Sequence, residues 1–353
     1  MSPRFFLLFA FAACARTPAP PPVVHSGAVV HTEEDPLVGL EHYDARTLFH
    51  LAGEAERNGD VDRGIALYDR LLENFPSDVV ADAARFNAGL LHERKKDFAA
   101  AIPYYEDIYQ SSLPPTVDGQ RTWLDAHYRA AVCLGKLERW WAAVALFERV
   151  EALDWLEDDD RLEALVGRGI SLQEAGDPDA AELVFSTALR FHRLVSRRRR
   201  FDDRGLAAEA AFRLGDISRE RFLAVILEYP VDTLRARLDE KCQALLSAQN
   251  RYLQAVRVGD THTVAAAGFR IGSLYERLYE QLMGLEVPPE LDAEEADVYL
   301  EEVHSRIGVL VEKAIKIYEK SLIAGRRIDS AASWVEQTEA ALARLKSIYL
   351  ARA

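Results

Sequence analysis

Residues 82–109 read DAARFNAGLLHERKKDFAAAIPYYEDIY and predict two short antiparallel helices joined by a turn at Lys95–Phe98. Apolar and small residues recur at spacings of three and four in each half, so each helix has one apolar stripe. Gly89 and Ala101 lie twelve residues apart, and small residues at facing positions let two helices approach closely. Tyr105 then fills the space further along the second helix.

The same order of small and aromatic residues recurs along the chain. Three more pairs of small residues lie twelve apart, and each is followed by an aromatic residue: Ala52 and Gly64 with Tyr68, Ala131 and Ala143 with Phe147, and Gly169 and Ala181 with Phe185. This series has a period of roughly 34 to 42 residues and resembles the tetratricopeptide repeat (TPR) family. The resemblance implies an all-α fold, a solenoid of antiparallel helix pairs that forms an α-α superhelix. It implies less about function, since such repeats have many binding roles.

The repeats fall into two regions. Residues 41–206 predict four TPR-like pairs, and residues 207–353 predict elongated pairs. In the second region the first-helix pattern restarts at Phe212 and again at Phe269, but the matching second helices come much later. The last predicted helix, Asp329–Leu350, has one apolar stripe and one polar face, which suits a terminal cap that closes the stack.

The amino-terminal residues predict a targeting segment and a tether. Residues 1–13 combine Arg4 with an apolar run too short to span a bilayer, and Cys14 follows two alanines. This resembles a bacterial lipoprotein signal peptide, which implies that Cys14 is lipidated. Ala15 stands where an aspartate favours inner-membrane retention, so the resemblance implies an outer-membrane lipoprotein that faces the periplasm. The alternative is an ordinary secretory signal with a chance cysteine. Residues 14–40 include a proline-rich run that suits an extended tether.

Composition and motifs exclude several classes of function. The 353-residue chain is 49% hydrophobic and has a formal net charge of −14, which argues against nucleic acid as the main partner. No hydrolase, phosphate-loop, dinucleotide or zinc motif occurs, so we expect no enzyme, cofactor, metal site or small-molecule substrate. Cys133 and Cys242 each sit in a helical stripe, and we expect buried thiols without a disulfide.

Two charged runs have alternative interpretations. The arginines of Arg197–Arg200 could contact a lipid headgroup or an acidic partner, but a solvated helix end is favoured. The acidic run Glu157–Asp160 is interpreted in the same way, as a solvated helix start rather than a cation site.

The resemblance also implies a binding surface. In TPR proteins the first helix of each pair lines the concave face, and the residue three before the small position tends to point into that groove. Here those positions hold Phe49, Phe86, Tyr128, Val166, Phe212 and Phe269. A row of aromatic residues, with Glu93 and Arg94 beside it, suits an extended peptide or a partner helix. The alternative is that the aromatic residues pack between successive pairs.

The carboxyl-terminal third adds a second resemblance. Lys241–Met283, with the segment through Trp334-Val335, resembles TPR lipoproteins of myxobacterial type, some of which belong to gliding-motility machinery. We therefore expect a lipid-anchored, non-enzymatic scaffold that gathers envelope proteins to assemble outer-membrane, pilus or motility complexes. The alternative is a cell-wall-associated adaptor that binds peptidoglycan or recruits a cell-wall hydrolase. Glycan binding favours exposed tryptophans, and the third pair contains three: Trp123, Trp140 and Trp141.

Overall fold

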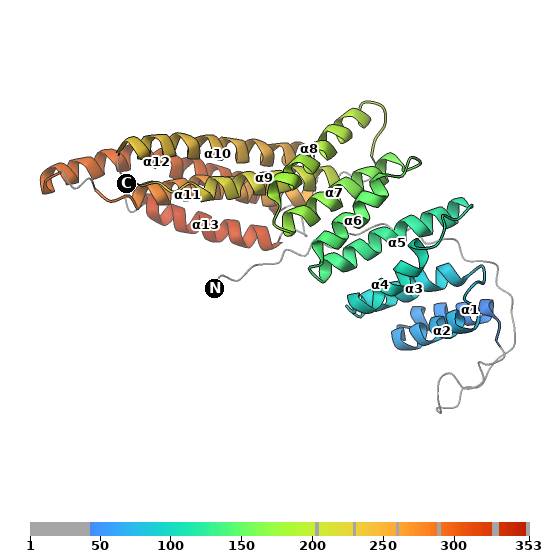
Figure 1. Cartoon of the computed structure of the whole chain (residues 1–353). Coiled ribbons are helices and arrows are strands. Elements are labelled where there is room, and N and C mark those ends of the chain that lie inside the picture. The colour runs from blue at the N-terminus through green and yellow to red at the C-terminus, as the bar shows by residue number, and fades with distance from the viewer. Residues whose placement is uncertain are drawn as a thin grey trace. The chain divides into compact units, whose positions relative to one another are not determined.

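The protein is all-α in the part that the computed structural model describes, which is residues 43–201, 205–228, 231–258, 261–287, 291–326 and 332–350. These residues form thirteen helices and no strand, and consecutive helices pack as pairs (Figure 1). The predicted helix-pair solenoid is confirmed. The expected signal peptide, residues 1–13, and the expected lipidated Cys14 with its tether, residues 14–40, lie outside the described residues.

The first four pairs have the lengths expected of short repeats. Their helices are α1 (Ala45–Arg57) and α2 (Val61–Asn74), α3 (Ala81–Arg94) and α4 (Phe98–Tyr109), α5 (Val117–Lys136) and α6 (Trp140–Glu151), and α7 (Asp158–Glu174) and α8 (Pro178–Val195). The predicted turn between residues 95 and 98 is present. Pro103 lies inside α4, and the helix continues through it without a break.

Sharp turns of three residues connect the two helices of each short pair. In three of them an aspartate, at 60, 97 or 177, accepts a hydrogen bond from the backbone N–H three residues on and so caps the second helix. The backbone enters the left-handed region at Gly59, with φ of +79°, and at Gly176, with φ of +88°. Glycine adopts this conformation without a steric penalty, which explains its place just before the capping aspartate.

The later helices are longer, as predicted. They are α9 (Gly205–Ala224), α10 (Val231–Val258), α11 (Thr261–Met283), α12 (Ala293–Gly325) and α13 (Ala332–Leu350). α10 has 28 residues and α12 has 33, whereas α8 has 18. α13 packs against α12 and α11, which is the position expected of a capping helix.

Each pair is held together by an aromatic ring seated on a small residue. A Cβ added at Gly89 would lie 2.6 Å from Cζ of Tyr105, and one added at Gly215 would lie 2.5 Å from Cδ1 of Tyr252. The same second-helix ring packs against an aromatic residue three positions before the glycine. Phe86 meets Tyr105 at a centroid distance of 5.7 Å. The glycine therefore creates the space in which both rings pack edge to face.

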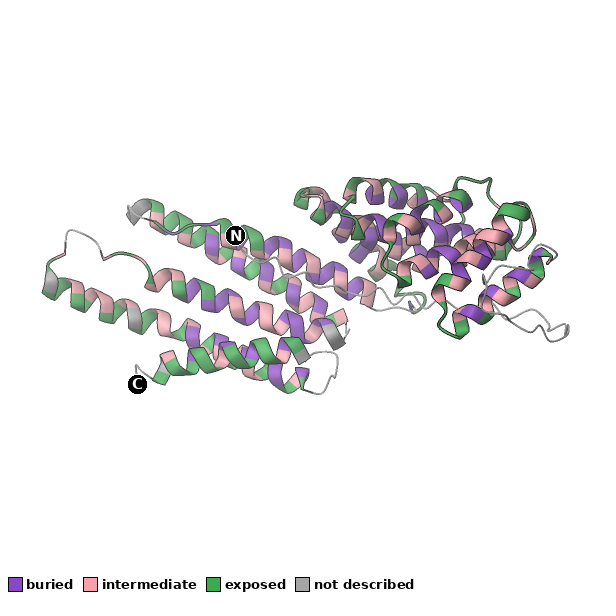
Figure 2. Cartoon of the chain, turned by 90° about the horizontal axis from the view of Figure 1, so that it is seen from below, coloured by how far each residue is buried: buried purple, intermediate pink, exposed green. Residues whose placement is uncertain are grey.

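The core lies between the layers of helices. Figure 2 shows buried and exposed stripes along the same helix, which is the pattern of an amphipathic element. Successive first helices also touch, α1 with α3, α3 with α5, α7 with α9, and α9 with α11. The first helices thus form a layer of their own, and this layer carries the residues predicted to bind a partner.

Candidate functional site

The eight residues predicted to line or border the groove all lie on first helices, and one of them, Val166 of α7, is fully buried. Phe49 is in α1, Phe86, Glu93 and Arg94 are in α3, Tyr128 is in α5, Phe212 is in α9 and Phe269 is in α11. The structure thus places them in one layer of helices, but some of them are buried and others are partly exposed.

The aromatic residues divide into half-buried and buried rings. Phe49, Phe86 and Phe269 are half-buried, whereas Tyr128 is only 6% exposed and Phe212 only 4%. The Tyr128 hydroxyl donates a hydrogen bond to the backbone oxygen of Asp160 at 2.6 Å. The rings of Tyr128 and Phe212 therefore serve packing, because a partner cannot reach them while the helices stay in place. Tyr128 lies against α7 through this hydrogen bond, and the Phe212 ring packs against Tyr252 of α10 at a centroid distance of 5.4 Å.

Half-buried apolar residues lie one helical turn after three of the predicted groove positions. Leu90, Val132 and Ile170 are half-buried on α3, α5 and α7. Each lies four residues after the position predicted to face the groove, and residues four apart share a helix face. Together with Phe49 and Phe86 they form what we call the first-helix surface. The sequence signal for these residues is an apolar residue four positions after the predicted groove position. The prediction relied on the aromatic residues and did not use this signal.

Exposed cations border this surface at the next turn. Arg57, Arg94 and Lys136 are exposed and occupy equivalent positions near the ends of α1, α3 and α5. Arg94 Nη2 lies 2.9 Å from Glu56 Oε1, with side chains 52% and 30% exposed. An exposed pair of this kind contributes about 0–1 kcal/mol, so Arg94 can exchange Glu56 for a carboxylate of a partner at little cost.

Glu93, by contrast, belongs to an internal network. It accepts a hydrogen bond from the Tyr105 hydroxyl at 2.6 Å and lies 3.4 Å from Nε of Arg129, which is on the next first helix. Its side chain is 13% exposed. Burial and the nearby Glu93 carboxylate raise the pKa of Tyr105 far above its usual range, so the hydroxyl remains a donor. Glu93 therefore connects two repeats and is poorly placed to contact a partner.

The same network recurs twice further along the chain. Asp216 accepts from Tyr252 at 2.6 Å and lies 3.4 Å from Arg270. Glu276 accepts from Tyr318 at 2.7 Å and is also bound by Arg344 of α13. We call these three networks the Tyr–carboxylate–Arg triads. In each, a first-helix carboxylate joins a tyrosine of its own pair to an arginine of the next element.

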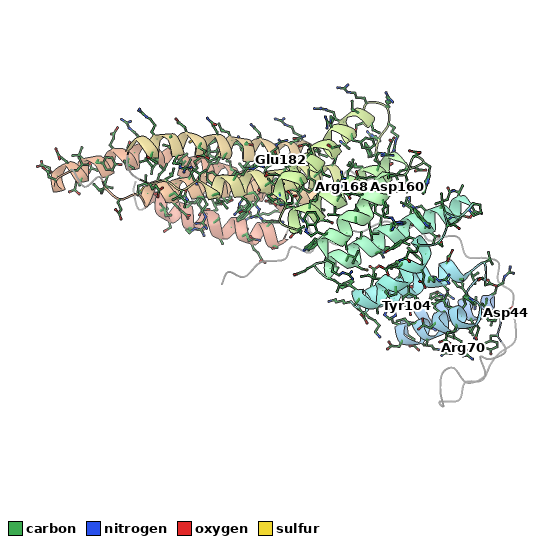
Figure 3. The ribbon with its side chains drawn as sticks, in the orientation of Figure 1. Asp44, Arg70, Tyr104, Asp160, Arg168 and Glu182 are labelled. Carbon is green, nitrogen blue, oxygen red and sulfur yellow. The ribbon has the colours of Figure 1, made fainter. Side chains whose placement is uncertain are left out.

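Parts of the two charged runs form ion pairs, and the rest of the basic run is exposed. Arg199 contacts Asp159 at 2.6 Å and Asp158 at 3.1 Å, so it lies against the acidic start of α7. Asp160, labelled in Figure 3, is 6% exposed and pairs with Arg121 of α5 at 2.7 Å. The other three arginines of the basic run are exposed, as expected of a solvated helix end.

Other candidate chemistry is sparse in the described part of the chain. Cys133 and Cys242 are free thiols; Cys133 is buried and Cys242 half-buried. Burial raises the pKa of the Cys133 thiol, which lowers its reactivity. Among the described residues no group of His, Cys, Asp and Glu has the arrangement of a metal site. Trp123 is buried, and Trp141 is 59% exposed at the start of α6.

In the segments that the structure describes, every helix is too short or too polar to cross a bilayer.

Comparison with known proteins identifies the repeat. Residues 50–113 match the family model described as tetratricopeptide repeat. A search of curated proteins gives no significant match. Similar solved structures include a tetratricopeptide repeat protein from Parabacteroides merdae, with 13% identity, coverage of 84% of this chain and 98% of that chain, and a TM-score of 0.38. The apo form of RapI has 11% identity, coverage of 86% and 99%, and a TM-score of 0.46.

A third similar structure is a TPR repeats protein from Bacteroides fragilis, with 11% identity, coverage of 73% of this chain and 98% of that chain, and a TM-score of 0.32. These values describe likeness to those proteins and add nothing about partners. Residues 50–113 thus match the tetratricopeptide repeat, and helix pairs of similar build continue beyond them.

Proposed function

We propose that this protein is a non-enzymatic scaffold that holds a peptide or helical segment of a partner protein on its first-helix surface. The tetratricopeptide-repeat fold suggests protein–protein interaction, and proteins of this family are typically non-catalytic. The observation that carries the proposal is the run of half-buried apolar residues on consecutive first helices, of which Phe86, Leu90 and Val132 are the centre. Apolar side chains that stay partly exposed across several elements are typical of binding grooves.

The polar border of the surface indicates the chemistry of the segment. The apolar residues would receive aliphatic or aromatic side chains of the partner, and Arg57, Arg94 and Lys136 would meet its carboxylates. Arginine binds carboxylates through two parallel hydrogen bonds, which fixes orientation as well as affinity. The partner segment therefore combines apolar anchors with nearby acidic residues.

We further propose that the scaffold is an outer-membrane lipoprotein that faces the periplasm. The support is the resemblance of residues 1–13 to a lipoprotein signal peptide, with Cys14 as the lipidated residue and residues 14–40 as a tether. The partners are then envelope proteins of outer-membrane, pilus or motility complexes, the last suggested by the myxobacterial resemblance. Partition of the protein into the detergent phase of a cell extract, and loss of that partition in Cys14→Ser, tests the anchor.

Affinity capture after in-cell cross-linking tests the binding surface. The variant combines Leu90→Asp with Arg94→Glu. The matched control combines Leu246→Asp with Arg237→Glu on α10, where Leu246 is 51% exposed and the change in charge is the same. Circular dichroism verifies that both variants fold. We expect a defined set of envelope proteins with the wild type and the control, and loss of that set in the Leu90 variant.

Two results would contradict the proposal. One is an unchanged set of proteins in the Leu90 variant, which would move binding away from the first helices. The other is a wild type that captures only abundant porins and instead retains purified peptidoglycan through a salt wash. That outcome would favour the cell-wall adaptor.

A further inference from the structure

A second, chemically different cleft lies between the carboxyl-terminal halves of α8 and α10. These two helices both pack against α9 (Figure 1). The side chains of their facing surfaces line a cleft with a volume of about 680 Å³. Its apolar lining comes from Leu189 and Val258. Its polar lining consists of two serines, one glutamine, one histidine and four arginines: Ser186, Ser196, Gln254, His192, Arg190, Arg193, Arg197 and Arg251.

Three of the four arginines of this cleft have no carboxylate partner in the described part of the chain. No described carboxylate lies within 4.0 Å of Arg190, Arg193 or Arg197. Arg190 donates to Thr187 Oγ1 at 3.3 Å. Arg168, labelled in Figure 3, differs from these three, because it pairs with Glu151 at 3.0 Å and with Glu148 at 3.6 Å.

One carboxylate approaches the cleft, and it is shared. Glu182, also labelled in Figure 3, lies 3.6 Å from Arg251 and 2.6 Å from Arg221 of α9. It therefore neutralises only part of the charge of Arg251. His192 stacks on Phe201 at a centroid distance of 4.9 Å, and burial lowers its pKa, so it is neutral at pH 7. The cleft is positive through its arginines alone, in a chain whose formal net charge is −14.

The spacing of the arginines indicates the kind of anion. Arg190 and Arg193 lie on one face of α8 at i and i+3, and Arg197 follows two residues beyond the end of this helix. A single phosphate is only a few ångströms wide and would meet one or two of these arginines. An acidic segment with several carboxylates can meet all three, together with Arg251 of α10.

We propose that this cleft is a second docking site, which binds an acidic segment of a partner protein through Arg190, Arg193, Arg197 and Arg251. Arginine is suited to this role because its planar guanidinium binds a carboxylate through two hydrogen bonds. The rest of the acidic chain repels such a segment, so the local positive field directs it to this cleft. The site goes beyond the proposed function, because it shares no residue with the first-helix surface.

Fluorescence anisotropy with the full chain tests the site. The probe is a fluorescein-labelled helical peptide with glutamates at i, i+3 and i+7, and its control carries glutamines there. The variant is Arg190→Glu with Arg193→Glu. The matched control is Arg235→Glu with Arg237→Glu, which makes the same change in charge in the amino-terminal half of α10. We expect the variant to bind the glutamate peptide at least roughly tenfold more weakly than the wild type, and the control to retain most of its affinity.

The salt dependence and the competing probes sharpen the result. Affinity for the glutamate peptide should fall between about 50 and 300 mM NaCl, because exposed charges are screened. Equal affinity of the wild type and the Arg190 variant, or equal binding of the glutamine peptide, would overturn the proposal. So would saturable binding of inorganic pyrophosphate or phosphatidylglycerol vesicles without binding of the peptide, since the cleft would then be a phosphate site.

The proposal for the cleft and the proposal for the first-helix surface can be tested independently. The variant with Leu90→Asp and Arg94→Glu leaves every residue of the cleft in place, and we expect it to bind the glutamate peptide like the wild type. Loss of peptide binding in that variant would mean that the peptide occupies the first-helix surface, which would overturn the second site and leave the first one standing.

Discussion

Single glycines decide how closely the helices of a pair approach. An alanine at position 89 would place its Cβ 2.6 Å from the Tyr105 ring, so the ring would have to move away from Phe86. We expect Gly89→Ala to lower the free energy of unfolding by about 1–3 kcal/mol, which is the usual effect of overpacking. Urea denaturation measures this change.

A second helical glycine supplies the control. An added Cβ at Gly53 of α1 would meet no side chain closer than that of Arg57, whose Nη1 would lie 3.5 Å away. Gly53→Ala should therefore raise the free energy of unfolding by about 0.5–1 kcal/mol through helix propensity. Equal destabilisation by both substitutions would show that the ring contact is not what position 89 requires.

A buried histidine makes stability depend on pH. His127 is 1% exposed, lies between Tyr109 and Trp123, and donates through Nδ1 to the Trp123 oxygen at 3.0 Å. Burial, with a smaller effect of Arg149, lowers its pKa from 6.5 to about 4. Between these values the unfolded chain binds a proton that the folded chain does not, so stability falls as pH falls from about 6.5 to about 4. The loss is on the order of 2–3 kcal/mol.

Denaturation at several pH values isolates this effect. The difference in unfolding free energy between the wild type and His127→Gln should shrink as pH falls through that window. His50, with a side chain 57% exposed, provides the control, and His50→Gln should keep the pH dependence of the wild type. If the stability of His127→Gln depends on pH as that of the wild type does, another group must cause the pH dependence.

For single residues, the sequence predicted correctly on which helix face a residue lies, but it predicted poorly whether that residue is buried. The spacing of Gly89 and Ala101 predicted close contact of two small residues, whereas the structure seats the Tyr105 ring on Gly89. The spacing also placed Tyr128 on a first helix, but it could not show that Tyr128 is covered. Burial depends on what lies opposite, and the opposing residues come from other helices.

The triads join one repeat to the next at the scale of helices. Glu276 is 4% exposed and receives Tyr318 of α12 and Arg344 of α13. Glu276→Gln removes the charge that Arg344 pairs with, and we expect it to lower the free energy of unfolding by about 1–3 kcal/mol. Amide hydrogen exchange should show loss of protection mainly in α13, because that helix is attached through Arg344.

An exposed ion pair of α12 provides the comparison. Glu302 lies 2.6 Å from Arg306 on the helix surface, and both side chains are more than half exposed. Glu302→Gln should change stability by no more than about 0.5 kcal/mol. Similar effects of the two substitutions would mean that the triad adds nothing beyond a surface pair.

The helices could be predicted from the sequence, but the triads that join one repeat to the next could not. The twelve-residue spacing of small residues and the aromatic residues that follow it predicted the short pairs. The triads were hidden because the arginine lies 36 residues after Glu93, 54 after Asp216 and 68 after Glu276. Such variable spacing leaves no period in the sequence, since it depends on the length of the helix in between.

For the whole molecule, the repeat pattern predicted the architecture and left the partner open. The family match ends at residue 113, although helix pairs continue to the end of the described chain. In the last pairs the lengths of α10 and α12 displace the second-helix residues from the distance that they have in the short pairs. Binding depends instead on which side chains remain exposed on the first-helix layer, and that is a property of the stacked repeats.

The central claim is that a partner protein lies on the first-helix surface. Site-specific photocross-linking in living cells tests it most directly, with a photoreactive phenylalanine at Leu90 in one strain and at Leu246 in another. Leu90 is half-buried on α3, and Leu246 is exposed on α10, remote from that surface. We predict that Leu90 yields discrete cross-linked species with one or a few envelope proteins and that Leu246 does not yield them. Discrete species from Leu246 alone, or none from Leu90, would contradict the account.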